Sequence, residues 1–100
     1  MSTHLQEYLV EITDSDSPYT ASVTRNIFCD ATSGAITVNL PTISGNTGRQ
    51  YTIKKIDSSA NAVTVDGSGA ETIDGSTTAV INSQYESITI QATSSEWGII

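Results

Sequence analysis

Few side chains in this sequence could do chemistry. His4 is the only histidine, and a Ser-His-Asp arrangement would require the N-terminal segment to fold back into a cleft. Cys29 lies in an apolar strand context, which favours a buried small hydrophobe over a reactive thiolate. Asp14 and Asp16 resemble the start of a calcium loop, but the glycine at the sixth position and the terminal glutamate are missing. We therefore expect no enzyme, no bound metal and no cofactor.

The other polar motifs fit turns and solvated surfaces better than binding sites. The loop at residues 44–48 holds two glycines, but no Lys-Ser or Lys-Thr pair follows, so it is not a phosphate loop. Asp66 and Asp74 each precede a glycine, which is typical of tight turns, and a calcium or sugar contact is the alternative there. Lys54 and Lys55 could attract an acidic partner, but we expect Lys54 to blunt an edge strand and Lys55 to be solvated.

Length and charge exclude several classes of partner. One hundred residues suffice for one domain, and the net charge is −7 with only four Lys and Arg residues. Nucleic acids and anionic membrane surfaces select clustered basic residues, so we expect neither as a partner. No apolar run approaches the ~18 residues that span a bilayer, and the N-terminus lacks the pattern of a signal peptide. With a single cysteine as well, the chain is expected to be made and folded in a cytoplasm.

Short strands must position all of these residues. Ser and Thr together number 29, and with Val and Ile they favour pleated, half-buried surfaces because a branched Cβ packs well there. Residues 7–13 alternate, with Tyr8, Val10 and Ile12 on one face. The predicted class is all-β, with further strands expected at residues 19–29, 35–40, 50–56, 62–65, 71–73, 79–82, 86–93 and 96–100.

The spacing of the turns predicts how the strands pair. Turn signals recur about every 8 to 12 residues, which favours a compact antiparallel sandwich or barrel of about seven to nine short strands. Asp66-Gly67 and Asp74-Gly75 lie eight residues apart and suggest a β-solenoid as the alternative. That spacing occurs only once, whereas a solenoid needs at least three stacked units, so we prefer the antiparallel fold.

Four segments carry a family resemblance. They are AITVNLP at residues 35–41, YTIKKIDSSANAVTV at 51–65 after Gly48, TIDG at 72–75 and WGII at 97–100. In this order and spacing they resemble a β-module of the virion proteins of tailed bacteriophages, which recurs in tail fibres, tailspikes and small head or neck appendages. The resemblance covers residues 19–100 and implies a structural protein of the virion, usually a homotrimer, with no catalytic residues to carry over. We therefore divide the chain into an attachment arm at residues 1–18 and a β-domain at residues 19–100.

Trp97, Ile99 and Ile100 form an apolar cluster near the end of a chain whose own core is modest. We expect these side chains in the core or at the subunit contact of a homotrimer. The alternative for Trp97 is stacking on a sugar ring, but its alternation with Ile99 favours the core or the interface.

Two functions agree with these expectations. In the first, the chain is a capsid decoration or cement protein, a trimer on the outside of the phage capsid that clamps neighbouring major-capsid subunits. Its arm would attach by strand addition, with Tyr8, Val10 and Ile12 entering shallow pockets of a neighbour. In the second, the chain is the receptor-binding tip of a tail fibre and recognises cell-surface glycan. We prefer the first because a fibre tip needs a shaft and this sequence offers none; both place the protein in the virion.

Overall fold

Alternating burial defines the strands of this protein. The computed structural model describes residues 8–100. In β5 (Gln50–Lys55) the side chains of Tyr51, Ile53 and Lys55 are buried, and in β6 (Val63–Asp66) the two valines are buried in the same alternating way. Since successive side chains of an extended chain point to opposite faces, each strand contributes one inward face to a shared core.

Seven further strands and one short 3-10 turn complete the described elements. They are β1 (Leu9–Thr13), the 3-10 turn η1 (Asp14–Asp16), β2 (Tyr19–Thr20), β3 (Asn26–Asp30), β4 (Ile36–Asn39), β7 (Thr78–Ile81), β8 (Ser87–Ala92) and β9 (Trp97–Ile99). The predicted all-β class and the predicted number of short strands are therefore confirmed. The strand predicted at residues 71–73 is wrong, because only Ile73 pairs there, through isolated bridges to Ser76 and Trp97.

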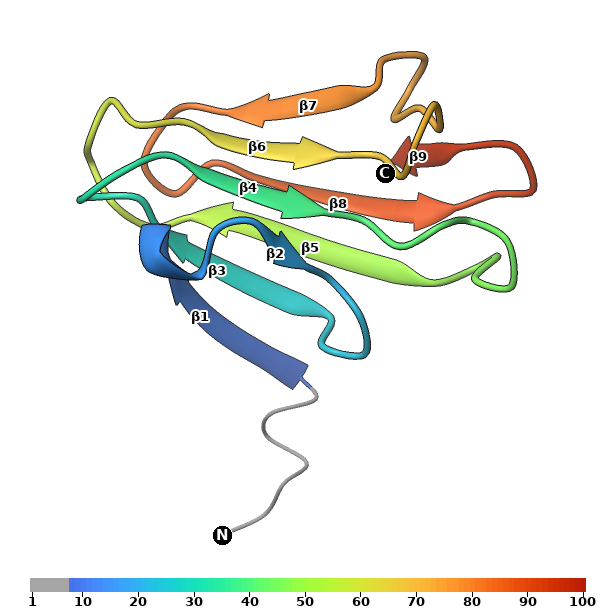
Figure 1. The fold of residues 1–100 in the computed structure, drawn as a ribbon, viewed down its shortest axis with the longest axis horizontal. Helices are drawn as coiled ribbons and strands as arrows, with labels where there is room; N and C mark the ends of the chain where they lie inside the picture. Colours follow the sequence, from blue (N-terminus) through green and yellow to red (C-terminus); the bar gives the residue numbers. More distant parts are fainter. Residues whose placement is uncertain (1–7) are drawn as a thin grey trace, which may run out of the picture.

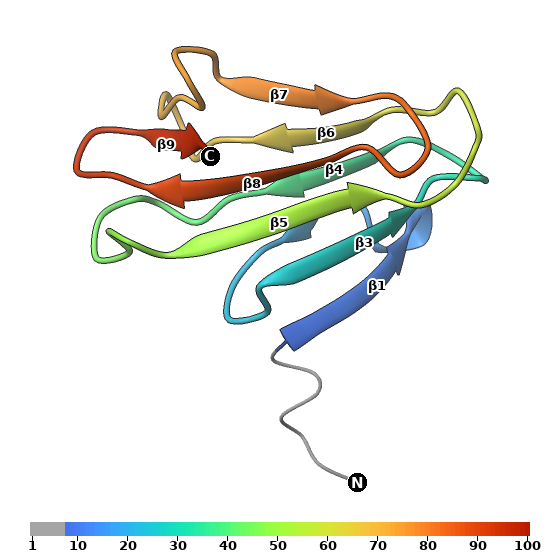
Figure 2. The ribbon, with the colours of Figure 1, turned by 180° about the vertical axis from the view of Figure 1, so that it is seen from behind.

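The nine strands form two sheets that face each other (Figure 1). The five-stranded sheet has the order β1-β3-β5-β8-β9, and the four-stranded sheet has the order β2-β4-β6-β7. From β1 to β6 the chain alternates between the two sheets. Each strand from β3 to β6 pairs in parallel with the strand that lies two before it in the sequence. The last three strands pair antiparallel with their neighbours, and they place β7 and β9 at the end of the molecule opposite β1 (Figures 1 and 2).

The strands form two sheets, as in the predicted sandwich, but the predicted antiparallel pairing is wrong for the first six strands. The pairs β1–β2, β3–β4 and β5–β6 stack as three successive turns of a winding chain, as in a short β-solenoid, and the two sheets do not close into a barrel. The eight-residue spacing of the Asp-Gly pairs does not match these turns. Leu9 lies opposite Asn26, 17 residues later, and Asn26 lies opposite Thr52, 26 residues later. Period-two alternation is the same in parallel and antiparallel strands, so the local pattern could not distinguish the two.

β1 belongs to the body of the protein, although the predicted boundary at residue 18 assigns it to an arm. Its residues pair in register with β3, from Leu9 opposite Asn26 to Thr13 opposite Asp30. The side chain of Ile12 is buried between the sheets. Residues 1–7 of the predicted arm lie outside the described residues.

Both Asp-Gly pairs lie in tight connections, but glycine is required for different reasons. Asp74 and Gly75 both have positive φ, at 47° and 86°, which is the combination that a two-residue hairpin turn requires. Ile73 and Ser76 pair on either side of this turn. Gly67 is required by close approach instead, because a Cβ there would lie 2.3 Å from the backbone carbonyl oxygen of Glu71.

Candidate functional site

Trp97 lies in the core, so its ring is not available for stacking on a sugar. The side chain is 0% exposed, and its ring centroid lies 5.7 Å from that of Tyr51. Its backbone N–H donates to the carbonyl of Thr72 at 2.9 Å, and its carbonyl accepts from the N–H of Asp74 at 3.0 Å. The buried indole N–H has no hydrogen-bond partner among the described residues. Trp97 therefore anchors β9 to the turn at 72–75.

Ile99 and Ile100, by contrast, are exposed at the edge of the five-stranded sheet. Ile99 lies opposite the fully buried Ile90 of β8, yet it is 41% exposed, and Ile100 is 68% exposed. Since cross-strand partners share a face of the sheet, Ile99 is an inward-facing side chain that the opposite sheet leaves partly uncovered. Val80 on β7, the edge strand of the other sheet at the same end, is also exposed. Val80 pairs with Thr64, which lies between the buried Val63 and Val65, so its side chain points to the outer face of its sheet, away from the core. We call Ile99 and Ile100 the apolar end.

The three residues of the predicted arm have different environments. Ile12 is buried in the core, so it cannot enter a pocket of another protein and that prediction is wrong. Val10 packs against the same core, whereas Tyr8 is exposed. The alternation placed Val10 and Ile12 on one face correctly, but these two side chains pack inside this chain. What β1 leaves free is its backbone edge, because it pairs on one side with β3 and has no strand on the other among residues 8–100.

Lys55 is buried, which corrects the expectation that it is solvated. β5 lies between β3 and β8, so Lys54 does not lie on an edge strand either. Lys55 is 0% exposed, and its Nζ donates to Asp57 Oδ2 at 2.7 Å and to Ser59 Oγ at 3.3 Å. Lys54 points the other way, with its Nζ 5.6 Å from the ring centroid of Tyr85.

Asp57 is the acceptor at the centre of the buried ion pair. Its Oδ1 accepts the N–H of Ala31 at 2.7 Å, and its Oδ2 accepts the N–H of Ser59 at 3.0 Å and the Ser59 hydroxyl, besides Lys55. Burial acts to raise the pKa of Asp57, but the hydrogen bonds from Lys55, Ser59 and Ala31 outweigh it and hold the pKa well below its ordinary value. The pair therefore fixes the turn after β5 against the segment after β3.

Cys29 has the environment expected of a structural cysteine. It is fully buried, and burial, together with the charge of Asp57, raises the pKa of its thiol to about 12. The prediction of a buried small hydrophobe is confirmed. His4 lies outside the described residues.

Two of the aspartates considered as calcium ligands, Asp16 and Asp74, accept backbone N–H groups instead. Asp16 accepts the backbone N–H of Thr13 at 3.0 Å, and Asp74 Oδ1 accepts that of Ile99 at 3.1 Å. Within residues 8–100, no three His, Cys, Asp or Glu side chains are grouped as metal ligands would be. Nor does this part of the chain contain a helix long and apolar enough to cross a membrane.

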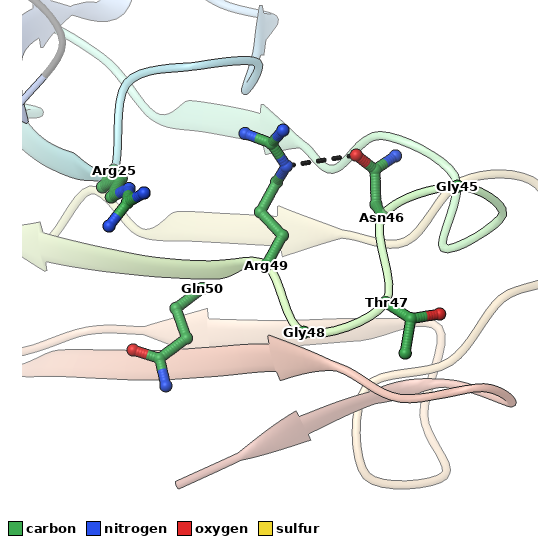
Figure 3. A pocket seen from close by; sticks show the side chains of 7 residues that line it. All are labelled: Arg25, Gly45, Asn46, Thr47, Gly48, Arg49 and Gln50. Atoms are coloured by element: carbon green, nitrogen blue, oxygen red, sulfur yellow. Dashed lines mark hydrogen bonds between the residues drawn. The ribbon is translucent and has the colours of Figure 1, made fainter.

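Both arginines line a surface pocket that the sequence did not predict. Its volume is about 340 Å³, and Arg25, Gly45, Asn46, Thr47, Gly48, Arg49 and Gln50 line it (Figure 3). Arg49 Nε donates to Asn46 Oδ1 at 3.1 Å, and Arg49 Nη1 donates to the carbonyl of Ser22 at 3.2 Å. The side chains that line it are polar or charged, apart from the two glycines. We call this site the arginine pocket.

Parallel pairing of β3 and β5 brings the two arginines together. Arg25 directly precedes β3 and Arg49 directly precedes β5. The N–H of Thr52 in β5 donates to the carbonyl of Arg25 at 2.8 Å, which fixes the relative positions of these segments. Parallel strands have their N-terminal ends side by side, whereas an antiparallel pair would have placed the two arginines at opposite ends of the strands. Because antiparallel pairing was expected, the sequence did not predict that Arg25 and Arg49 lie in one pocket.

Neither the protein-family models nor the curated proteins give a match to this chain.

Proposed function

We propose that this protein is a structural protein of a bacteriophage virion, a capsid decoration protein that clamps neighbouring major-capsid subunits as a homotrimer. The observation that carries the proposal is the apolar end, where Ile99 and Ile100 are exposed at the edge of the five-stranded sheet. The resemblance of residues 19–100 to β-modules of virion proteins supplies the biological setting.

The apolar end favours association through side chains. Exposed apolar surface that continues a core is typical of contacts between proteins. The outer edge of β9 is already occupied, because the N–H of Trp97 donates to Thr72 and the N–H of Ile99 donates to Asp74 Oδ1. A second subunit would therefore pack against the isoleucine side chains instead of extending the sheet. Three copies related by a three-fold axis close such an interface and leave no apolar end exposed.

The edge of β1 offers a separate surface for the capsid. An edge strand presents unpaired backbone groups that an extended segment of a partner can bind. Leu9 is exposed beside this edge and adds an apolar contact. β1 and the apolar end lie at opposite ends of the molecule (Figure 2), so trimer formation and attachment would not compete. A trimer attached in this way would bridge three capsid subunits with one closed interface.

Light scattering during size-exclusion chromatography tests the trimer. We expect a mass three times that of the 10.6 kDa chain. The double variant Ile99→Ser, Ile100→Ser should elute as a folded monomer, because both side chains are exposed in the single chain. Val23→Ser is the matched control, since Val23 is also exposed but lies outside the apolar end. A single 10.6 kDa species for the unaltered protein at micromolar concentrations would contradict the proposal.

The number of copies in purified virions tests the location. A decoration protein should be present in roughly hundreds of copies that follow the three-fold positions of the capsid, because symmetry repeats its site. Virions that lack it should adsorb normally but break more readily on heating. A count of only a few tens would instead support the second candidate, the glycan-binding tip of a tail fibre.

A further inference from the structure

The arginine pocket concentrates most of the free positive charge of an acidic chain. Four residues are basic and eleven are acidic. One of the four, Lys55, is neutralised inside the core by Asp57. Of the three basic side chains that remain, Arg25 and Arg49 line one pocket, brought there from separate segments by the parallel pairing of β3 and β5.

No carboxylate neutralises either arginine in the described part of the chain. The ion pair between Lys55 and Asp57 is the only one between side chains of residues 8–100. Arg49 is held by two neutral acceptors, the carbonyl of Ser22 and the side-chain oxygen of Asn46, and these contacts fix its guanidinium without cancelling its charge. Arg25 makes no side-chain hydrogen bond with residues 8–100. Two cations therefore share a pocket that contains no anion.

The loop at residues 45–48 forms one wall of the pocket. Gly45 and Gly48 have φ of 78° and 91°, values that favour glycine. A Cβ at either position would meet no heavy atom within 4 Å, so both positions face open space, although the backbone of Gly48 is held to β8 by hydrogen bonds with Ala92 and Gln91. Thr47 and Gln50 also line the pocket, with a hydroxyl and an amide on the opposite side of the loop from the Arg49 guanidinium (Figure 3). These groups suit a ligand that carries hydroxyls as well as a negative charge.

We propose that the arginine pocket binds an acidic sugar, with Arg25 and Arg49 donating to its carboxylate and Thr47 and Gln50 contacting its hydroxyls. Guanidinium groups match the planar carboxylate and form charge-assisted hydrogen bonds with it. A polyanion such as nucleic acid would be repelled by the net charge of −7, whereas a singly charged sugar residue meets mainly the local pocket. This site is independent of the apolar end, so it does not depend on the proposed assembly.

Nuclear magnetic resonance titration of the whole ¹⁵N-labelled protein with glucuronate tests the proposal. We expect saturable shifts of the backbone amide signals of Thr47, Gly48, Arg49 and Gln50, and no such response to glucose, which has the same ring without the carboxylate. Glucose 1-phosphate separates a carboxylate from a phosphate as the preferred anion, and it should bind more weakly than glucuronate.

Arg25→Gln is the decisive variant, because Arg25 makes no side-chain hydrogen bond in residues 8–100 that holds the fold. It should weaken glucuronate binding at least tenfold, whereas Lys54→Gln, which removes the same charge outside the pocket, should leave binding unchanged. Arg49→Gln should also weaken binding, although it removes the contacts to Ser22 and Asn46 as well. The proposal is overturned if glucuronate gives no saturable shift, if glucose or glucose 1-phosphate binds as well, or if Arg25→Gln and Lys54→Gln behave alike.

Discussion

Replacing Asp57 with alanine would remove the negative charge of the buried ion pair and leave the positive charge of Lys55 in the core. The substitution leaves the Lys55 ammonium, which is 0% exposed, with only the Ser59 hydroxyl at 3.3 Å. It also removes the acceptor of the Ala31 and Ser59 N–H groups. Removing one partner of a buried ion pair costs about 3–5 kcal/mol because the other charge is left uncompensated. We expect Asp57→Ala to lower the free energy of unfolding by about this amount.

The reverse substitution should cost less. In Lys55→Met, Asp57 keeps the N–H of Ala31 and both donors of Ser59, so we expect a loss of about 1–3 kcal/mol. The double variant leaves no buried charge, and its loss should be smaller than the sum of the two single losses. Lys54→Met is the matched control, because Lys54 is only half-buried on the opposite face, and it should cost less than about 1 kcal/mol.

Urea unfolding followed by tryptophan fluorescence measures these differences. Trp97 is the only tryptophan and is fully buried, so its emission reports loss of the core. The comparison requires equal slopes of free energy against urea concentration in all variants. A loss below about 1 kcal/mol for Asp57→Ala, or strict additivity in the double variant, would refute the assignment of a coupled buried pair.

The same pair predicts how stability responds to acid. The pKa of Asp57 is lower in the folded protein than its unfolded value of about 3.9, so its contribution is fully present above that pH. The contribution is lost as the pH falls from the unfolded pKa through the folded pKa. Hydrogen bonds from the Thr72 hydroxyl and the Gly75 N–H lower the pKa of Glu96 in the same direction. Asp57→Ala should therefore remove part, but not all, of the decrease in unfolding free energy below about pH 4.

Three further outcomes are expected. Trp97→Ala should lower the free energy of unfolding by about 3–5 kcal/mol, measured in urea by circular dichroism, because the ring is fully buried; a loss below about 1 kcal/mol would contradict that burial. Gly67→Ala should cost about 1–3 kcal/mol or more, because its Cβ would lie 2.3 Å from the Glu71 carbonyl oxygen. Gly98→Ala is its control and should be nearly neutral, since the nearest atoms lie 3.9 Å and 4.0 Å away. Cys29 should not react with a disulfide reagent at pH 8 until urea unfolds the protein, because its thiol is buried and has a pKa of about 12; rapid reaction of the folded protein would show that it is accessible.

The sequence by itself determined most of the strands and several of the turns. Branched side chains that alternate with polar ones predict an extended chain with one inward face, and this local pattern is visible in segments such as 50–55. The Asp74-Gly75 turn was predicted because aspartate and glycine adopt positive φ at little cost, and both do so here. Burial of Cys29 followed from its apolar neighbours in the same strand.

Only the tertiary structure decided which strands pair and which distant residues meet. Alternation specifies a face but not a neighbour, so the parallel winding of β1 to β6 could not be read locally. Lys55 looked solvated because charge is usually exposed, and its burial depends on Asp57 being held by the distant N–H of Ala31. Arg25 and Arg49 share a pocket because parallel strands begin at the same edge of a sheet. Each of these features depends on pairings across many residues, which local side-chain preferences do not encode.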